Sequence, residues 1–421
     1  MLIEDTATLE DFCDRVRGAP TLSLDTEFLW ERTYSPRLCL VQVGSGQDFA
    51  AVDVLSPKLD PEPLWELLDA PDQLKILHAA SNDLRVLYDR RGALLPRVFD
   101  TQVAAAMLGH GHQIAYAALV KKLLRRTLDK SSQRTDWSRR PLSRRQLVYA
   151  IDDVAWLGPI HERLHSALVQ RGRDGWLTED MEALLDEELY RFQPEEAWRR
   201  LPLARVQGSA RNVARALAGW RERAARRLDR PRGHVISDDA LLELARAAPT
   251  RVRDLAGHSA LGSALRSDAD RRELLASIQE GLEDAEGPSV PTPRRTRRAT
   301  RDALVALLQA VLKQRCEELD IASALIINRA ELERLASGDE AGVGALSGWR
   351  YEVFGRQALD LRDGHLTLRW TGDQLEAVRH DAAPARPMPA RDRTDTRAPR
   401  RNPERAPSPR RKPKQRRSLY D

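Results

Sequence analysis

The sequence predicts a mixed α/β domain at the N-terminus, followed by two helical blocks and a basic tail. Three observations support this order. Strand-like runs fill residues 21–54, short strands and helices then alternate up to residue 107, and strand-like patterns nearly vanish beyond residue 141. Alternation of short strands with helices is typical of an α/β sheet. A chain of 421 residues is also long enough for roughly two to four domains.

The first strand-like run, residues 21–27, alternates between polar and apolar side chains. Successive side chains of a strand point to opposite faces. Asp25 and Glu27 are therefore expected to share one face, with Leu22 and Leu24 on the other. Two carboxylates are thereby predicted next to each other on one surface of the sheet.

Two more strand-like runs follow directly. Residues 37–43 are almost continuously apolar, as in a strand that is buried on both faces. The Gly-Ser-Gly sequence at 44–46 is a turn signal, and it leads into a third run at 49–54. We therefore expect these three strands to form a meander.

Short strands and helices alternate in the next segment. A strand is predicted at 74–77, and the helix after it should be capped by Ser81 and end at Gly92. A second strand at 98–99 precedes a helix for which Asp100 is the expected N-cap. This alternation places the segment in the same α/β sheet.

Helical patterns dominate from residue 141 onward. Ser143 and Gln146 fit a capping box, and the helix after them carries an apolar stripe. Further helical patterns lie at residues 180–189, 212–227, 238–247, 271–281 and 300–370. The Gly- and Pro-rich stretch 287–293 reads as a linker between the two helical blocks.

Composition excludes several classes of protein. Cys13, Cys39 and Cys316 lie far apart and form no CxxC pair, so neither a disulfide scaffold nor a zinc site is expected. Their scarcity favours the reducing cytoplasm as the location. The acidic N-terminal segment does not resemble a signal peptide. No run approaches the roughly 18 apolar residues of a membrane span, so no membrane partner is expected.

Positive charge is concentrated at the C-terminus. The formal net charge is +5, yet Arg and Lys greatly outnumber acids between Asp381 and Asp421, so the preceding chain is net acidic. Such a tail is typical of proteins that bind polyanions such as RNA or DNA. A solubilising, disordered end has the same composition, and composition alone leaves both interpretations open.

Four acids carry the candidate chemistry. Asp25 and Glu27 share a strand face, Asp83 opens a predicted helix, and Asp153 lies on a later one. Carboxylates 4 Å apart repel by about 4 kcal/mol per pair at an effective dielectric near 20, so acids that converge need cations. Two divalent ions held in this way clamp the attacking and leaving oxygens of a phosphoryl transfer. Each acid taken singly is an ordinary surface residue, and only the combination carries the prediction.

A tyrosine accompanies the last acid. Tyr149 and Asp153 are four residues apart on a predicted helix, so they are neighbours on one face. Asp153 is then placed to bind metal, while the Tyr149 hydroxyl positions the attacking water. Asp152 lies near the same face, and spacing alone does not decide between the two aspartates.

These motifs resemble those of ribonuclease D, which belongs to the DEDD superfamily of 3′–5′ exonucleases and to its subgroup with a tyrosine in the third motif. The matching motifs are residues 24–28, 78–84 and 149–153, and the similar stretches between them are residues 32–38, 99–102 and 128–137. The third motif, Tyr-x-x-x-Asp, selects Asp153 over Asp152. The resemblance covers most of residues 1–165.

The resemblance implies a ribonuclease-H-like α/β exonuclease domain, with a mixed five-stranded sheet flanked by helices. It implies that two Mg²⁺ or Mn²⁺ ions are bound by four acids, namely Asp25, Glu27, Asp83 and Asp153, and that Tyr149 orients the nucleophilic water. The implied activity is that of a 3′–5′ exoribonuclease. It would trim tRNA precursors and other small structured RNAs and release nucleoside 5′-monophosphates.

The helical blocks resemble HRDC domains, which are small all-α modules shared by helicases and ribonuclease D. Residues 211–282 carry the first resemblance, and residues 300–370 resemble a more divergent second module. The predicted organisation is an exonuclease domain at 1–168, a helical connector at 169–207, an HRDC domain at 208–285, a linker at 286–298, a second HRDC-like domain at 299–375 and a disordered Pro/Arg-rich tail at 376–421.

Other residues have two interpretations each. A basic stretch in the first helical block is suited to phosphate contacts or to a solvated face; it comprises Arg221, Arg223, Arg226, Arg227, Arg230 and Arg232. Trp30 is suited to stacking on a terminal base or to the core. His110 and His112 have a metal-like spacing, but we expect loop residues because no further Cys or His lies near them in the sequence.

Two other functions compete with the exoribonuclease. A 3′–5′ DNA exonuclease is one, because HRDC modules occur in helicases and no residue identifies a contact to a 2′-hydroxyl. A catalytically inactive RNA-binding scaffold is the other, and the intact acid set argues against it. We expect the protein to act as a monomer.

Overall fold

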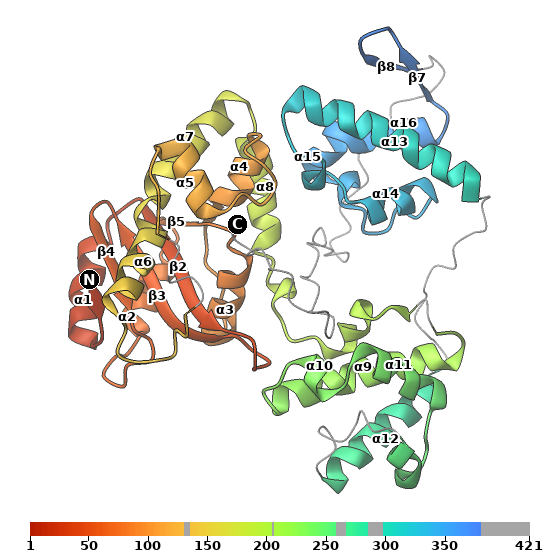
Figure 1. Cartoon of the computed structure of the whole chain (residues 1–421), viewed down its shortest axis with the longest axis horizontal. Helices are drawn as coiled ribbons and strands as arrows, with labels where there is room; N and C mark the ends of the chain where they lie inside the picture. Colours follow the sequence, from red (N-terminus) through yellow and green to blue (C-terminus); the bar gives the residue numbers. More distant parts are fainter. Residues whose placement is uncertain (130–134, 204–205, 258–266, 285–297, 380–421) are drawn as a thin grey trace. The chain divides into compact units, whose positions relative to one another are not determined.

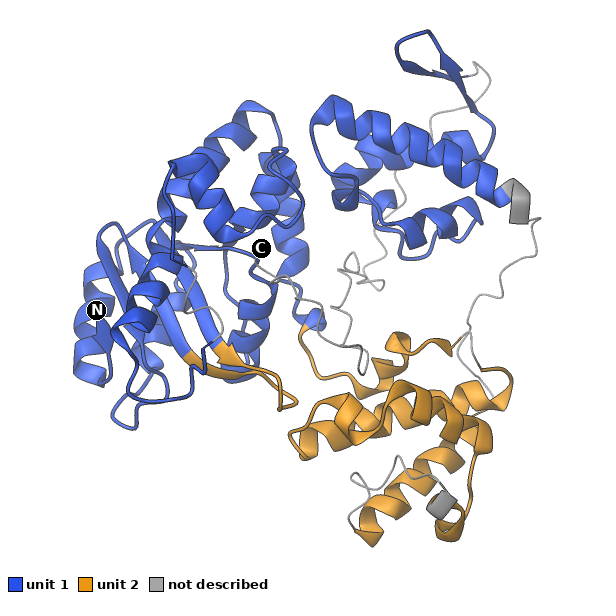
Figure 2. Ribbon diagram, in the orientation of Figure 1, with its two compact units in different colours: residues 1–27, 40–189, 293–421 blue, residues 28–39, 190–292 orange. Residues whose placement is uncertain are grey.

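The structure is a computed structural model that describes residues 1–129, 135–203, 206–257, 267–284 and 298–379. The chain divides into two compact units (Figure 2). One unit contains the described parts of Met1–Glu27, Leu40–Leu189 and Pro293–Asp421. The other contains the described parts of Phe28–Cys39 and Tyr190–Thr292.

A six-stranded mixed sheet forms the centre of the N-terminal domain (Figure 1). Its strands are β1 (Leu2–Ile3), β2 (Thr21–Leu29), β3 (Arg37–Ser45), β4 (Asp48–Val52), β5 (Leu74–Leu77) and β6 (Val98–Asp100). Their order is β1-β4-β3-β2-β5-β6. The β3–β4 pair is antiparallel, whereas β1–β4, β2–β5 and β5–β6 are parallel. The neighbours β2, β3 and β4 match the predicted meander. The sheet has one strand more than expected, because the two-residue β1 pairs with β4.

Burial along β2 alternates from Leu24 to Glu27 as predicted, although Ser23 is buried as well. Leu22 and Leu24 are fully buried, whereas Asp25 and Glu27 are half-buried. In β3, residues 38–44 are all buried, as predicted for a strand covered on both faces. The apolar face of β2 therefore fixes the strand in the core, and its acidic positions are left at the edge of the solvent.

Helices cover this sheet. They are α1 (Thr6–Val16), α2 (Glu62–Asp69), α3 (Ser81–Arg91), α4 (Thr101–Met107), α5 (Tyr116–Leu124), α6 (Arg144–Ala155), α7 (Leu157–Gln170) and α8 (Asp174–Leu184). Helices α1 and α6 contact β4, α7 contacts β5, and α8 contacts β6. Helix α6 thus lies against the sheet, where it can bring its side chains to the acids of β2.

Two of the three predicted helix caps are confirmed. Asp100 caps α4 by accepting from two backbone N–H groups, and Ser143 forms a capping box with Gln146 at the start of α6. The prediction for Ser81 was wrong. The N-cap of α3 is Ala80, which has no side-chain acceptor, and the backbone there donates to a distant carboxylate instead. Gly92 ends α3 as predicted, with a φ of +73° that suits glycine.

The second unit is mainly helical. Its elements are η2 (Pro194–Arg200), α9 (Ser209–Arg227), α10 (Arg232–Val235), α11 (Asp238–Ala247), η4 (Val252–Gly257) and α12 (Asp268–Glu283). Helix α9 packs against α11, α12 and η2 around a core that includes Leu217, Trp220 and Leu241. A Cβ at Gly281 would lie 2.5 Å from Cα of Val213, so the close approach of α12 to α9 requires glycine.

The C-terminal block belongs to the first unit. Its elements are α13 (Arg298–Leu319), η6 (Ser323–Leu325), α14 (Arg329–Ala336), η7 (Gly344–Leu346), α15 (Gly348–Arg350), the π-helix η8 (Tyr351–Gly355), α16 (Arg356–Arg362), β7 (Leu366–Trp370) and β8 (Leu375–Arg379). The antiparallel β7–β8 hairpin corrects the prediction of an all-α module. Its turn contains Gly372 with a φ of +104°, a conformation that glycine readily adopts.

Contacts between α8 and α15 fix this block in place, and we name them the α8–α15 latch. The rings of Trp176 and Trp349 stack with their centroids 4.5 Å apart. Arg350 donates to both oxygens of Asp180 at 2.6 and 2.9 Å, and the Trp349 indole donates to the same carboxylate at 3.1 Å. Two-point pairs of this kind are among the stronger polar contacts in proteins.

Some predictions fall at the limits of the described residues. The predicted linker at 286–298 lies outside them except for Arg298, which begins α13. The predicted tail begins at 376, but residues 376–379 belong to β8, and the rest of the tail lies outside the described residues. Within the part of the chain that is described, no helix combines the length and apolarity of a membrane span.

Candidate active site

Three carboxylates converge where β2 meets α6. Each of Asp25, Glu27 and Asp153 offers an oxygen, and these oxygens all lie within 4.8 Å of one another. The first two share a face of β2, and the third comes from the last turns of α6. The three side chains are half-buried, so the cluster retains access to solvent. We name Asp25, Glu27, Asp153 and the neighbouring Asp83 the acid cluster.

Asp83 lies beside the other three but is oriented toward Thr26. It is in the first turn of α3 and only 6% exposed. The Thr26 hydroxyl donates to its Oδ1 at 2.5 Å. Asp83 is nevertheless close enough to Asp25 for its charge to raise the pKa of that carboxyl. The structure therefore gathers the four predicted acids, with Asp83 outside the tightest set of three.

Burial disfavours the charged form of every acid in the cluster, and repulsion between these acids adds to it at Asp25 and Glu27. Burial is the main cause that raises the pKa of Asp25 and Glu27 well above the usual range, and the charges of the neighbouring acids raise both further. Burial also raises the pKa of Asp83 and of Asp153 to about 7. An ionised cluster at neutral pH therefore requires nearby positive charge.

A divalent metal ion meets that requirement. The donors are all carboxylate oxygens, which are the hard ligands that Mg²⁺ and Mn²⁺ prefer. The buried Asp53, which directly follows β4, has a different environment. It forms a two-point ion pair with Arg140 at 2.5 Å, so its charge is compensated by the protein itself. The acid cluster instead combines mutually repelling carboxylates with a geometry that fits a cation.

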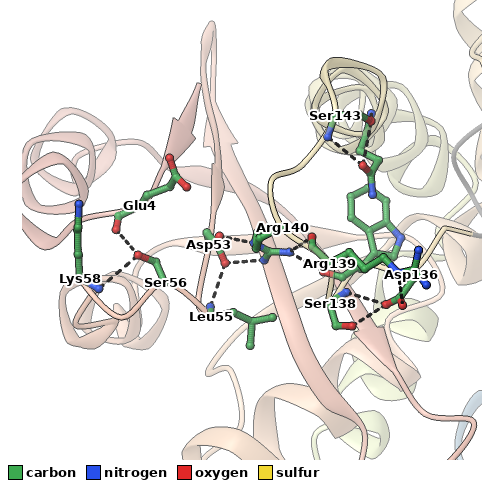
Figure 3. Close-up of polar contacts among 12 residues, drawn as sticks. Glu4, Asp53, Leu55, Ser56, Lys58, Asp136, Ser138, Arg139, Arg140 and Ser143 are labelled. Atoms are coloured by element: carbon green, nitrogen blue, oxygen red, sulfur yellow. Dashed lines mark hydrogen bonds and ion pairs between the residues drawn. The ribbon is translucent and has the colours of Figure 1, made fainter.

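The same ion pair anchors the segment that leads into α6 (Figure 3). Arg140 also donates to the carbonyl of Trp137 at 2.7 Å, and Asp136 accepts from the backbone and hydroxyl of Ser138. The capping box at Ser143 then begins the helix. These contacts join the start of α6 to β4 and thereby set the position of the side chains that α6 brings to the acid cluster.

Tyr149 completes the arrangement. Its hydroxyl is hydrogen-bonded to Asp153, one turn further along α6, and its ring lies 6.1 Å from that of the buried Trp137. Burial and the charge of Asp153 are the leading causes that raise the pKa of Tyr149 far above its usual range. The phenol therefore stays protonated. The structure places Asp153, and not Asp152, in the set of three converging acids.

Two contributors to the site were missed by reasoning from the sequence. Thr26 holds Asp83, although simple strand alternation directs it away from the acids. The buried Tyr116 donates its hydroxyl to the carbonyl of Asp152 at 3.2 Å. Burial raises the pKa of Tyr116, and the charges of Asp153 and Asp25 add to the effect. No motif in the sequence distinguishes Tyr116 from an ordinary core tyrosine.

Other predicted residues lie elsewhere. Trp30 is 41% exposed, and its indole donates to the carbonyl of Tyr34 at 3.2 Å, so it is not a core residue. In the described chain, the potential metal-binding group comprises Asp25, Glu27 and Asp153, and it does not include His110 or His112. Both histidines lie in the irregular segment between α4 and α5, as expected for loop residues.

The basic stretch of the second unit is only partly available for phosphate. Arg221 is 5% exposed, and it donates to Asp238 at 2.7 Å and to the carbonyl of Ile236 at 3.1 Å. Arg232 is held by the buried Glu222. Both arginines stabilise their own domain, which corrects the idea of one continuous phosphate-binding stretch. Arg223 and Arg226 are exposed.

Comparisons with known proteins identify the family of this chain. A family model described as 3′–5′ exonuclease matches residues 1–169, and the HRDC domain model matches residues 210–277. Ribonuclease D of Acidiphilium cryptum is 39% identical over 382 residues, which cover 90% of this chain and 97% of that protein. Ribonuclease D of Jannaschia sp. is 40% identical, with 89% and 98% covered.

Solved structures give the same result. The crystal structure of Escherichia coli RNase D, described as an exoribonuclease involved in structured RNA processing, matches with a TM-score of 0.76 and 29% identity. The match covers 87% of this chain and 99% of that one. The agreement extends over the exonuclease domain and both helical blocks. The chain therefore belongs to the ribonuclease D family of 3′–5′ exoribonucleases.

Proposed function

We propose that this protein hydrolyses RNA from the 3′ end at the acid cluster, with two divalent cations, Mg²⁺ or Mn²⁺. The observation that supports this most is the convergence of three carboxylates within 4.8 Å, with Asp83 beside them. Asp25, Glu27 and Asp153 are the proposed primary ligands, and Asp83 is the fourth. Cations bound there would stabilise the charge on the attacking and leaving oxygens of a phosphodiester.

Tyr149 is proposed to orient the attacking water. Its hydroxyl is hydrogen-bonded to Asp153 and stays protonated, because burial raises the pKa of the phenol. A phenol that donates to a carboxylate retains lone pairs, which accept a hydrogen bond from water. That hydrogen bond would turn a lone pair of the water toward the phosphorus. The ring contact with Trp137 keeps the phenol in place.

We propose tRNA precursors and other small structured RNAs as substrates and nucleoside 5′-monophosphates as products. The support comes from relatives named ribonuclease D and from the Escherichia coli enzyme, which is described as acting in structured RNA processing. The helical modules would hold the body of the RNA. Arg223 and Arg226, which are exposed on α9, are the proposed phosphate contacts.

The proposal also covers the location, the oligomeric state and the competing functions. The cytoplasmic location rests on three buried cysteines that form no disulfides. A monomer is proposed as the active form. The RNA-binding scaffold is disfavoured because the acids of all three motifs are present and gathered. DNA as the substrate is the alternative that an assay must separate.

The test uses the full-length protein and a 5′-labelled RNA that ends in a 3′-hydroxyl. Stepwise shortening is expected with Mg²⁺ or Mn²⁺, and none with EDTA. Asp25→Asn should abolish shortening but leave RNA binding largely intact. Asp48→Asn, which changes an exposed acid of β4, is the matched control and should retain full activity. Full activity in Asp25→Asn would remove the acid cluster from the mechanism.

A DNA strand of the same sequence, assayed side by side, decides the sugar preference. Faster shortening of the RNA supports the proposed substrate class. Equal or faster shortening of the DNA favours the DNA exonuclease instead. Release of single nucleoside 5′-monophosphates, separated by chromatography, distinguishes exonucleolytic release from internal cleavage, which yields oligonucleotides.

A further inference from the structure

Asp100 is a fully buried carboxylate at the junction of β6 and α4. It accepts hydrogen bonds from four backbone N–H groups. Two of them belong to α4, where Asp100 is the N-cap: Gln102 donates at 2.8 Å and Val103 at 3.3 Å. The other two belong to Ala79 and Ala80, at 3.0 and 2.9 Å. The Asp100 carboxylate thus accepts hydrogen bonds from two separate segments of the chain.

The second segment is the turn that begins α3. Ala79 has a φ of +61°, in the left-handed region, which is unfavourable for an L-residue. Ala80, the N-cap of α3, has no side chain that can accept a backbone hydrogen bond. The Asp100 carboxylate supplies this missing acceptor from twenty residues away in the sequence. The turn is therefore held by an interaction that the local sequence does not provide.

Asp83 follows Ala80 by three residues and lies in the first turn of α3. The position of that turn sets where the Asp83 backbone stands relative to β2. The Thr26 hydroxyl then fixes the side chain. Asp100 and Thr26 thus hold Asp83 from two directions, one through the helix start and one at the carboxylate itself.

A second chain of contacts starts at the same place. His78, which precedes the turn, lies 2.9 Å from both the Thr101 hydroxyl and the carbonyl of Ile114. Two residues further on, Tyr116 donates to the carbonyl of Asp152 on α6. The buried corner around Asp100 is therefore connected both to α3 and to α6, the two helices that contribute acids to the cluster.

We propose that Asp100 is a positioning residue that places Asp83 for metal binding by holding the turn at Ala79 and Ala80. The inference rests on the proposed metal role of Asp83 and adds a residue outside the acid cluster. An isosteric Asn cannot replace Asp100, because its NH₂ group would face one of the four N–H donors. The turn would then lose an acceptor on one side.

The experiment measures Mn²⁺ binding to the full-length protein by calorimetry, without RNA. Asp100→Asn is compared with Asp83→Asn and with a matched control, Asp5→Asn. Asp5 is also the N-cap of a helix, α1, and it accepts from the backbone of Thr8 at 3.0 Å. Supporting groups around metal ligands typically contribute about 10- to 100-fold in affinity. We expect a loss in that range for Asp100→Asn and an unchanged affinity for Asp5→Asn.

Kinetics provide a second readout. In Asp100→Asn, the Mn²⁺ concentration that gives half-maximal kcat should rise by a factor in the same range. High Mn²⁺ should restore most of kcat, and KM for RNA at saturating Mn²⁺ should stay within about twofold. A general loss of folding would lower the active fraction at every Mn²⁺ concentration and would not be restored by metal. If Asp100→Asn does not fold, Asp100→Ser, which keeps an N-cap for α4, is measured in its place.

The outcomes separate this inference from the proposed function. Weaker Mn²⁺ binding in both Asp83→Asn and Asp100→Asn supports the two together. Weaker binding in Asp83→Asn with native affinity in Asp100→Asn overturns the positioning role alone. Native affinity in Asp83→Asn overturns its proposed metal role and the inference with it.

Discussion

Replacing Asp153 by Asn should stabilise the metal-free protein at neutral pH. Burial raises the pKa of Asp153 from its ordinary value of 3.8 to about 7. A difference of roughly three pKa units corresponds to about 4 kcal/mol, at 1.36 kcal/mol per unit. This is an upper bound, because the side chain is only half-buried and water screens part of the effect. Asn retains the shape and an oxygen that accepts from Tyr149.

The sign follows from the linkage between protonation and folding. A carboxyl with a raised pKa holds its proton more tightly in the folded state, so the folded state is penalised once the unfolded chain has released that proton. For Asp153 the penalty is absent below about pH 4, grows between about pH 4 and 7, and is complete above that window. The metal-free native protein should therefore lose stability as the pH rises through this window, and the variant should lose less.

Urea unfolding after EDTA treatment, at about pH 5 and about pH 7.5, measures the effect. Asp153→Asn should exceed the native protein in free energy of unfolding by up to about 4 kcal/mol at the higher pH, and by clearly less at the lower one. Asp48→Asn, at an exposed position, serves as the control. Equal native stability at both pH values, or a variant less stable than the native protein at pH 7.5, refutes the reasoning.

Three further outcomes are expected. Asp153→Asn should lower kcat on RNA by at least about 100-fold, while Asp152→Asn stays near the native rate; comparable losses in both would mean that the third motif is misassigned. Tyr149→Phe should lower kcat by about 100-fold but leave Mn²⁺ affinity unchanged in calorimetry, and a loss of affinity would make Tyr149 part of the metal site. Arg140→Met leaves the buried Asp53 without its ion-pair partner; thermal unfolding should show a loss of about 3 kcal/mol, and an unchanged Tm would contradict the anchoring role.

Regular patterns in the sequence predicted the parts of the fold that depend on local periodicity. The strand period of two put Asp25 and Glu27 on one face, and the structure shows both beside Asp153. The capping box at Ser143 and the N-cap at Asp100 were read from short-range chemistry and are present. The catalytic roles of these acids rest on the resemblance and stay predictions.

The features that could not be predicted from the sequence depend on contacts between residues far apart in the chain. Ser81 is a reasonable cap by type, but the acceptor for the start of α3 comes from Asp100, and no local rule points there. Thr26 reaches Asp83 although alternation assigns it to the opposite face. The strand β1 is only two residues long and exists because β4 offers a free edge. In each case tertiary packing decided between local options.

The α8–α15 latch changes how a shortened version of this protein should be built. Trp349 and Arg350 come late in the chain, yet their partners Trp176 and Asp180 lie directly after the nuclease fold. A truncated chain that stops before residue 208 would expose one face of the Trp176 ring and leave the Asp180 carboxylate without its hydrogen bonds from Trp349 and Arg350. Removing the HRDC domain alone, while the C-terminal block is retained, keeps both sides of the α8–α15 latch in the chain. Order along the gene is therefore a poor guide to which segments can be removed together.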